Sequence, residues 1–129
     1  MKILLDTHAI IWAISGDARL SSLAREAIQN AEEAYWSPLS LWEMAIKISI
    51  KKDSFGLSGD WHTIIPNYLS DNQFTKIDIT PQHCAAVSTL PMHHRDPFDR
   101  MLITTAQCED LIVVTRDSAF AHYDVRTIW

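Results

Sequence analysis

The stretch Lys2-Ile3-Leu4-Leu5-Asp6 near the start of the chain decides its fold class. Its three apolar residues follow one another without the alternation of a half-exposed strand, which indicates a strand buried on both faces, as in parallel sheets. The run 111–115 has the same character near the other end of the chain. Because helix-forming segments separate these strands, the sequence predicts a three-layer α/β/α domain around a mainly parallel central sheet.

The other predicted elements follow from capping residues, prolines and apolar spacing. Thr80 and Asp96 each precede a proline, which favours them as N-caps of helices that begin at that proline. Ser21 or Ser22 is expected to cap another helix, and Pro66 to kink or break a weaker one. The predicted helices are 20–31, 38–50, 60–69, 81–90 and 97–109, with a helical turn at 118–122 and further strands at 34–37, 74–79 and 125–128.

The composition is that of one globular domain spanning residues 1–129. Hydrophobic residues make up 47% of the chain and charged residues 21%, which excludes an intrinsically disordered protein. Cys84 and Cys108 fit no disulfide framework, so we expect a cytoplasmic protein. The longest apolar run, 9–14, falls far short of the ~20 residues that span a membrane.

The position of the acidic residues is more informative than their number. The chain has 16 acidic and 11 basic residues, and its net charge of -5 argues against a basic coat for nucleic acid. Asp6 follows the first strand, and Asp117 follows the strand 111–114 after two residues. Both are therefore expected at the carboxyl ends of central strands, where open α/β sheets bind ligands. Each could equally cap the helical turn that follows it.

Two further carboxylates are expected on inward helix faces. Glu43 shares the helix 38–50 with an apolar stripe formed by Leu39, Trp42, Ile46 and Ile50. A buried lone charge is costly, and an ion pair with Lys47 at i+4 is the plainer alternative. Asp99 precedes apolar residues at i+3, i+4 and i+7, although the helix dipole alone would favour an acid there.

These four carboxylates cannot pack together in ionised form without a counter-charge, because their repulsion would raise their pKa values and destabilise the fold. A divalent cation supplies that charge. Oxygen ligands favour Mg²⁺ or Mn²⁺ over Zn²⁺, and the neighbouring His93 and His94 are expected to diverge toward solvent or substrate. A metal–carboxylate pocket on an α/β domain indicates phosphoryl chemistry.

Four short motifs carry the acids. They are Asp6-Thr7-His8 after a strand, Ser40-Leu41-Trp42-Glu43, His94-Arg95-Asp96-Pro97-Phe98-Asp99-Arg100 and Thr115-Arg116-Asp117. In their order and spacing they resemble the PIN-domain ribonucleases, and among these the VapC toxins of bacterial toxin–antitoxin operons. The resemblance extends from the first strand to Trp129.

The resemblance implies a Mg²⁺- or Mn²⁺-dependent endoribonuclease that cleaves structured RNA, such as tRNA or rRNA, by metal-activated water. Asp6, Glu43 and Asp99 match the core metal-binding acids of the family, and Asp117 matches its more variable fourth acid. The role of Asp96 beyond capping stays open. A homodimer and a cognate VapB-type antitoxin are also implied, with DNA contacted only through the antitoxin.

Basic side chains near the acids are candidates to hold the phosphates of RNA. Arg100 and Arg116 are favoured because each adjoins a predicted metal ligand. The other candidates are Lys47, Lys51, His93, His94 and Arg95. For every candidate, a solvated surface charge or an ion pair with a carboxylate is an equal alternative.

Other functions fit parts of the pattern. A haloacid-dehalogenase-type phosphatase also has an Asp after its first strand, but it needs a second Asp where this chain has His8. A phosphate-receiver domain needs a strand-end Lys that the Thr115-Arg116-Asp117 segment does not supply. A catalytically silent PIN domain that binds RNA or protein would lack core acids, and all four are present. With these four set aside, 12 acidic residues remain against 11 basic ones, so the surface is not hostile to RNA.

Overall fold

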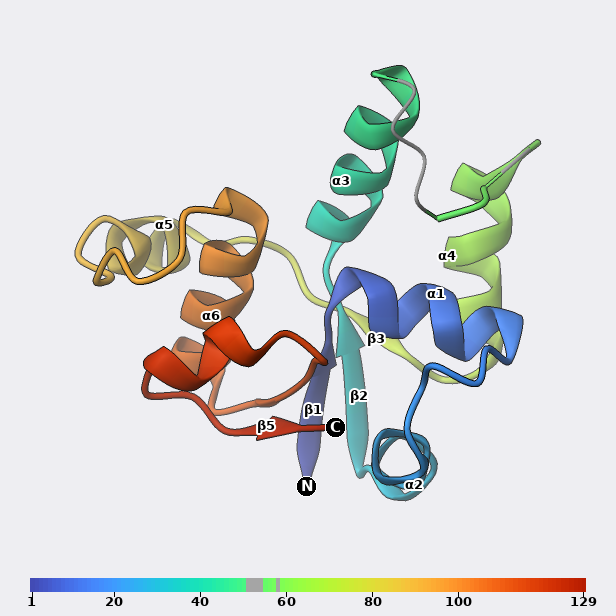
Figure 1. The fold of residues 1–129 in the computed structure, drawn as a ribbon, viewed down its shortest axis with the longest axis horizontal. Helices are drawn as coiled ribbons and strands as arrows, with labels where there is room; N and C mark the ends of the chain where they lie inside the picture. Colours follow the sequence, from blue (N-terminus) through green and yellow to red (C-terminus); the bar gives the residue numbers. More distant parts are fainter. Residues whose placement is uncertain (51–54, 58) are drawn as a thin grey trace.

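A single parallel sheet organises the chain. The computed structural model describes residues 1–50, 55–57 and 59–129 (Figure 1). Its strands lie in the order β3-β2-β1-β4-β5, and every pairing between them is parallel. The strands are β1 (Lys2–Leu5), β2 (Glu33–Trp36), β3 (Thr75–Lys76), β4 (Ile112–Val114) and β5 (Thr127–Ile128).

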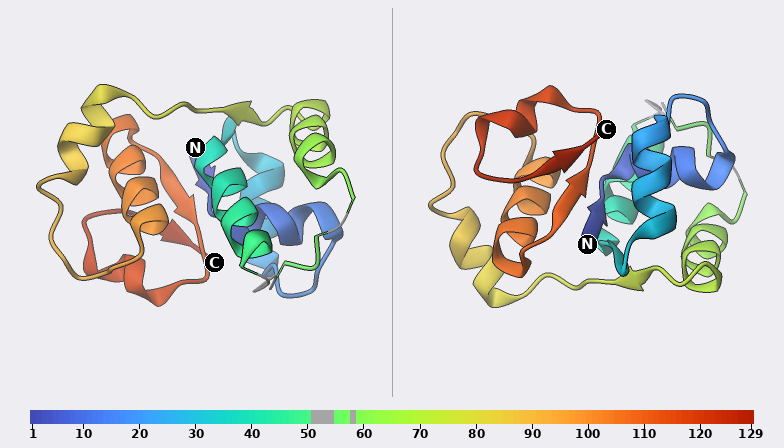
Figure 2. Two further views of the ribbon diagram at one scale, coloured as in Figure 1. Left: turned by 90° about the horizontal axis from the view of Figure 1, so that it is seen from above. Right: turned by 90° about the horizontal axis from the view of Figure 1, so that it is seen from below.

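Helices cover both faces of the sheet, which confirms the predicted three-layer arrangement. They are α1 (Thr7–Ser15), α2 (Ser22–Asn30), α3 (Pro38–Ser49), α4 (Trp61–Asp71), α5 (Pro81–Val87), α6 (Pro97–Glu109) and the 3₁₀ turn η1 (Ser118–His122). Ile3 and Leu5 of β1 pack with α1, α2 and α4, whereas Leu4 packs with α6 and η1. The two helical layers lie on either side of the strands in Figure 2. The central strand β1 is therefore buried on both faces, as its unbroken apolar run predicts.

The carboxyl ends of β1 and β2 each lead directly into a helix. Asp6 alone separates β1 from α1, and Ser37 alone separates β2 from α3. The side chain of each residue caps the helix that follows it. Asp6 accepts a hydrogen bond from the backbone amide of Ala9, and Ser37 accepts one from the backbone amide of Leu39. As a result α1 and α3 begin at the same edge of the sheet, near the N-terminal end of α6 (Figure 1).

Several predicted boundaries are confirmed by their caps. Ser21 caps α2, Thr80 caps α5 and Asp96 caps α6, each through a side-chain oxygen that accepts a backbone N–H. The helix Pro97–Glu109 has the predicted bounds. The strands predicted at 74–79 and 125–128 are shorter, two residues each, because only Thr75–Lys76 and Thr127–Ile128 pair with a neighbouring strand.

Three features of the helices were not predicted correctly. The apolar run 9–14, for which no element is predicted, belongs to α1, whose mostly buried surface leaves no polar face to mark it as a helix. Helix α4 continues through Pro66, since the buried side chains of Ile65 and Leu69 hold it against the core. The predicted stripe on α3 is wrong at Trp42 and Ile50, which are 60% and 55% exposed.

Helix α3 turns a different face inward from the one expected. Its buried residues are Leu39, Ser40, Glu43 and Met44. The helix ends at Ser49, one residue before its predicted bound, and residues 51–54 and 58 beyond it lie outside the described residues. Among the described residues, none of the helices has the length and apolar character that a bilayer crossing requires.

Candidate metal centre

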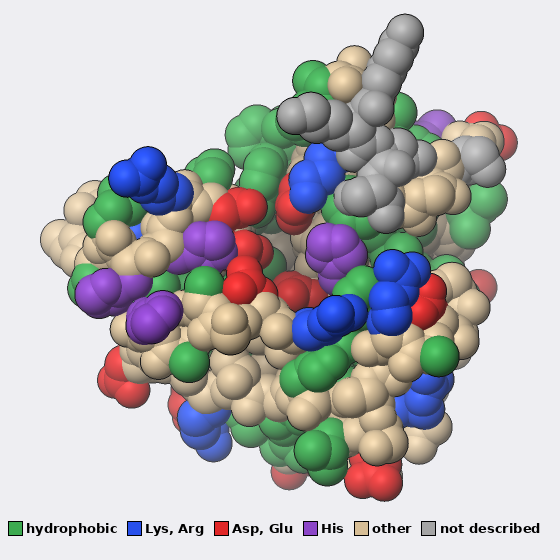
Figure 3. All heavy atoms as spheres, viewed as in Figure 1, with side chains coloured by type: hydrophobic (Ala, Val, Ile, Leu, Met, Phe, Trp, Pro, Cys, Tyr) green, Lys and Arg blue, Asp and Glu red, His purple; other side chains and the backbone are tan. Residues whose placement is uncertain are grey.

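The four predicted acids meet at the carboxyl edge of the sheet. Figure 3 shows acidic side chains gathered in a hollow of the surface, with histidine, lysine and arginine side chains around it. Asp6 comes from the end of β1, Glu43 from α3, Asp99 from the first turn of α6 and Asp117 from the residue before η1. Electrostatic interactions join Asp6 to Glu43 and Asp117, and Asp99 to Glu43. The structure therefore brings together all four residues that the sequence singled out.

Asp6, at the end of β1, is buried at 7% exposure. Its Oδ1 accepts a hydrogen bond from the backbone N–H of Ala9 at 2.8 Å, so it caps α1 as well as facing the other acids. The pKa of Asp6 is raised to about 6, above all by burial and also by the charges of Glu43 and Asp117. Hydrogen bonds from the Thr115 side chain and the Ala9 backbone oppose this shift. The capping and site interpretations of Asp6 are therefore compatible.

Glu43 is buried at 6% exposure, as predicted, and its carboxylate has partners on both sides. The hydroxyl of Thr7 donates to Oε1 at 2.7 Å, and Lys47 Nζ lies 3.3 Å from Oε2. The i,i+4 ion pair, the plainer alternative, is therefore present in addition to the inward position. Thr7 Oγ1 also lies 3.0 Å from Ser40 Oγ, which links the starts of α1 and α3.

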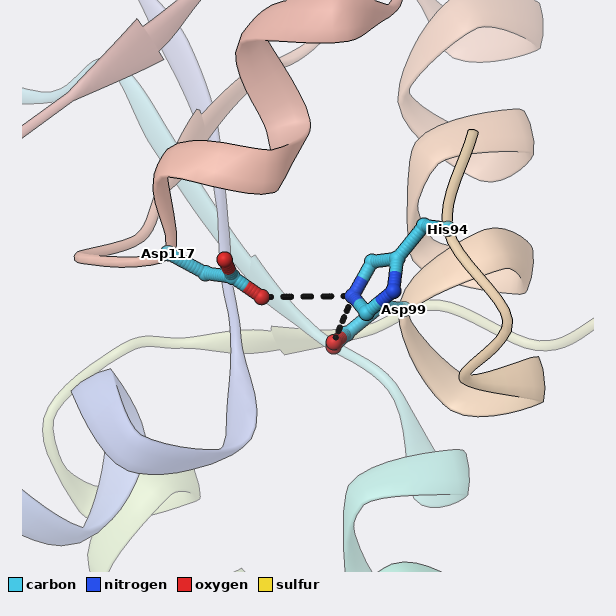
Figure 4. A group of neighbouring side chains, drawn as sticks. All are labelled: His94, Asp99 and Asp117. Atoms are coloured by element: carbon cyan, nitrogen blue, oxygen red, sulfur yellow. Dashed lines mark hydrogen bonds and ion pairs between the residues drawn. The ribbon is translucent and has the colours of Figure 1, made fainter. Parts of the chain in front are cut away.

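Asp99 and Asp117 face each other across an imidazole. The Nε2 atom of His94 lies 2.8 Å from Asp99 Oδ2 and 3.2 Å from Asp117 Oδ2 (Figure 4). Asp117 uses its other oxygen, Oδ1, to accept from the amide of Ala119 and cap η1. Burial and the charges of Asp96 and Glu43 raise the pKa of Asp99 to about 7, and the hydrogen bond with His94 opposes the shift.

His94 differs from its prediction. It does not lie at the surface, because only 20% of its side chain is exposed and its ring points into the acid cluster, while its contact with substrate stays a prediction. Its backbone is fixed from two sides: its N–H donates to the Tyr123 hydroxyl at 2.8 Å, and its carbonyl oxygen lies 3.4 Å from Arg100 Nη1. Tyr123 is remote in the sequence, and the presence of Arg100 in the same motif does not indicate which way its side chain points. The sequence therefore contains no local signal for the position of the His94 ring.

Arg100 also requires a correction. It is buried, and its guanidinium donates to the carbonyl oxygens of Pro91 at 2.8 Å and Leu90 at 3.0 Å. A side chain held in this way fastens the segment 90–94 to α6 and is not free to contact RNA phosphates. Its position next to Asp99 in the sequence correctly predicted that Arg100 lies beside the site. It did not predict the direction of the side chain.

Arg116 and Lys47 are the basic candidates that adjoin the acid cluster. Arg116 is exposed, with its guanidinium carbon 5.6 Å from the centre of a Trp12 ring. Lys47 is half-buried in its pair with Glu43, and its Nζ lies 5.0 Å from the centre of the Phe55 ring. Arg95 is exposed, and Lys51 lies outside the described residues.

The donors fit a divalent cation. Asp6 and Asp99 have raised pKa values, first because burial removes their carboxyl groups from water and then because other carboxylates lie nearby. A cation would supply the counter-charge. His94, Asp99 and Asp117 each offer a ligand atom, and these atoms lie within 4.8 Å of one another. Asp96 directs Oδ1 to the amides of Phe98 and Asp99, which supports its role as a cap.

Comparisons with known proteins identify the fold and the family. The chain is 27% identical to ribonuclease VapC22 of Mycobacterium tuberculosis over 132 residues, which cover 98% of each sequence. Its fold is similar to a chain of VapBC2 from Rickettsia felis bound to a promoter DNA fragment, with a TM-score of 0.69 at 15% identity over 98% of this chain and 97% of that one. DNA-bound VapBC from Salmonella typhimurium gives a TM-score of 0.68 at 17% identity over 98% and 96%. Because the model of the PIN domain matches residues 3–126, this chain belongs to the PIN-domain family.

Proposed function

We propose that this protein is a divalent-metal-dependent endoribonuclease and the toxin of a toxin–antitoxin pair. The observation that carries the proposal is the convergence of Asp6, Glu43, Asp99 and Asp117 from four separate segments at one edge of the sheet. Similarity to a ribonuclease over nearly the whole chain supports the same reaction.

Asp6, Glu43, Asp99 and Asp117 would hold Mg²⁺ or Mn²⁺, and this role remains our proposal for each of them. When bound, such an ion activates water for attack on a phosphodiester and neutralises charge on the phosphoryl oxygens. The fold already restrains three of these carboxylates, because caps fix Asp6 and Asp117 while Thr7 and Lys47 orient Glu43. Little ordering of these side chains is therefore left to the binding step.

The substrate and partners are proposed from the resemblance to the VapC toxins. We propose that structured RNA, tRNA or rRNA, reaches the acids along a rim where Arg116 and Lys47 contact its phosphates. A VapB-type antitoxin is proposed because the similar structures are VapBC complexes, and a homodimer because the resemblance to the VapC toxins implies one. DNA would be contacted only through the antitoxin.

A catalytically silent PIN domain is the second candidate, and the four acids argue against it. A domain that only bound RNA would gain nothing from burying carboxyl groups with raised pKa values, since these oppose folding at neutral pH. Membership of the PIN-domain family argues against the other alternative, a phosphatase of the haloacid-dehalogenase type.

The decisive experiment uses purified protein and total RNA with Mg²⁺, with Mn²⁺ or with a chelator. We expect discrete cleavage products with 5′-phosphate and 3′-hydroxyl ends only when metal is present, and none from Asp6→Asn or Asp99→Asn. Equal cleavage by the wild type and both variants would overturn the proposal, because the activity would then be a contaminant or independent of this site.

A further inference from the structure

The acid cluster contains a nitrogen donor that an all-carboxylate site would not have. His94 approaches from the segment before α6, between Asp99 on that helix and Asp117 at the start of η1 (Figure 4). Its Nε2 lies 2.8 Å from an oxygen of one carboxylate and 3.2 Å from an oxygen of the other. One imidazole nitrogen thus contacts the two acids at once.

These separations match those of atoms that share one ion. Ligands about 2.1 Å from an octahedral cation, at right angles to each other, lie about 3.0 Å apart. The two distances from Nε2 fall on either side of that value. The same distances serve a hydrogen bond in the metal-free protein, where Nε2–H donates to both carboxylates, so little movement separates the two arrangements.

A buried network holds the backbone of the segment that carries His94. The Tyr123 hydroxyl accepts from the backbone amides of His93 and His94 and donates to the carbonyl of Pro91. Arg100, itself buried, binds the carbonyls on the same segment. A surface histidine that merely contacted solvent would need no such support.

We propose that His94 is a metal ligand, and that together with Asp99 and Asp117 it forms a mixed nitrogen–oxygen site that prefers Mn²⁺ to Mg²⁺. This inference rests on the proposed metal dependence and deepens it by naming the ion. Imidazole is a better ligand for Mn²⁺ than for Mg²⁺, because Mg²⁺ favours oxygen ligands and keeps its own water shell. Ligation would require the neutral ring with its proton on Nδ1, so that the Nε2 lone pair faces the ion.

The wild-type protein can test the ligand directly. Metal-free protein is loaded with Mn²⁺, and electron spin echo modulation is recorded to detect ¹⁴N coupled to the ion. We expect the coupling of one directly bound imidazole nitrogen. Tightly bound Mn²⁺ without nitrogen coupling would overturn the proposal, and this result needs no variant that must fold.

Calorimetry of Mn²⁺ and Mg²⁺ binding to His94→Gln gives an independent test, with circular dichroism to check the fold. We expect the affinity for Mn²⁺ to fall at least about tenfold and the affinity for Mg²⁺ to fall less, so that the preference for Mn²⁺ over Mg²⁺ becomes smaller. His93→Gln, which removes the neighbouring exposed imidazole, is the matched control and should leave both affinities unchanged. Tighter binding of both ions to His94→Gln would mean that the ring only occupies the metal position, and would contradict ligation.

Failure here and failure of the proposed function give different results. Nitrogen-coupled Mn²⁺ in a protein that does not cleave RNA would uphold His94 as a ligand and refute the ribonuclease. RNA cleavage by a protein whose bound Mn²⁺ lacks nitrogen coupling would do the reverse.

Discussion

The two walls of the acid cluster are built in different ways. The first, which we call the α1/α3 wall, contains Asp6, Thr7, Ser40, Glu43 and Lys47. Asp6 is restrained by capping its own helix, and Glu43 by the i+4 lysine and by the hydroxyl of Thr7 at the start of α1. The second, the α6/η1 wall, contains His94, Asp99 and Asp117, which contact one another through a single imidazole nitrogen.

The support behind each wall differs as well. The α1/α3 wall rests on two helices that begin directly at the ends of β1 and β2. The α6/η1 wall depends on the segment 90–94, whose backbone is held by Arg100 and by Tyr123, which is remote from it in sequence. Strand ends and caps position the first wall, whereas one buried arginine and one tyrosine position the second.

The largest effect should come from Arg100→Met, which removes the guanidinium that supports the α6/η1 wall. It leaves the carbonyls of Leu90 and Pro91 without their charged donor, and hydrogen bonds to charged groups contribute about 1.5–3 kcal/mol each. We expect the free energy of unfolding, measured by urea titration, to fall by about 3 kcal/mol.

Arg95→Met is the matched control, because Arg95 is exposed in the same motif. Its effect should stay within about 0.5 kcal/mol. If Arg100→Met left stability unchanged and weakened only RNA binding, Arg100 would be an RNA contact after all, and our account of this wall would be wrong.

Asp6→Asn tests the α1/α3 wall and should stabilise the metal-free protein. The raised pKa of Asp6, about 6 in the folded state, means that its ionised form opposes folding. The native state therefore holds a proton that the unfolded state loses between about pH 4 and pH 6, and stability falls as pH rises through this window. Asparagine keeps the cap but carries no charge, so we expect a gain of about 1–3 kcal/mol at pH 8 and almost none at about pH 3.5.

Asp17→Asn serves as a control of opposite sign. Hydrogen bonds from Arg19 lower the pKa of Asp17 to about 2, so its ionised form favours folding and its contribution is lost as pH falls toward that value. Urea titrations of both variants at the two pH values give the comparison. A loss of stability at pH 8 for Asp6→Asn would show that the Asp6 charge is already compensated in the metal-free fold.

The difference between the walls also explains what could be predicted from the sequence. The sheet, its parallel pairing and the caps Thr80 and Asp96 follow from apolar runs and from local residue pairs, which act over a few positions. Helix α1 was missed because a buried helix has no polar face to give it a period. The strand predicted at 74–79 was too long because pairing with β2, and not propensity, limits it to two residues.

The same holds for the site. The four acids could be named because each follows a strand or lies on an inward helix face. The inward stripe on α3 was misplaced at Trp42, and Glu43 was nevertheless buried because it binds Thr7 and Lys47. His94 and Arg100 could be located near the site but not oriented, because their directions depend on hydrogen bonds with residues 90–94 and with Tyr123.

The smallest effects come from a pair of identical substitutions, one in each half of the molecule. Thr7→Val removes the hydroxyl that donates to the buried carboxylate of Glu43, and should lower the free energy of unfolding by about 1–2 kcal/mol. Thr104 on α6 is equally buried, yet its hydroxyl has no hydrogen-bond partner among the described residues. Thr104→Val should therefore be neutral or stabilising by up to about 1 kcal/mol, because it replaces an unsatisfied polar group with a methyl of similar size.

The sign of the difference between these two variants, and not either value alone, tests the comparison of the walls. Valine differs from threonine by the same atoms at both positions, so the changes in volume and side-chain entropy largely cancel. The remaining difference in the free energy of unfolding, measured by urea titration, compares the loss of the Thr7–Glu43 hydrogen bond with the loss of the unpaired Thr104 hydroxyl. Equal losses for both variants would mean that the hydroxyl of Thr104 is satisfied in solution, and that hydrogen bonding to Glu43 adds nothing specific to the α1/α3 wall.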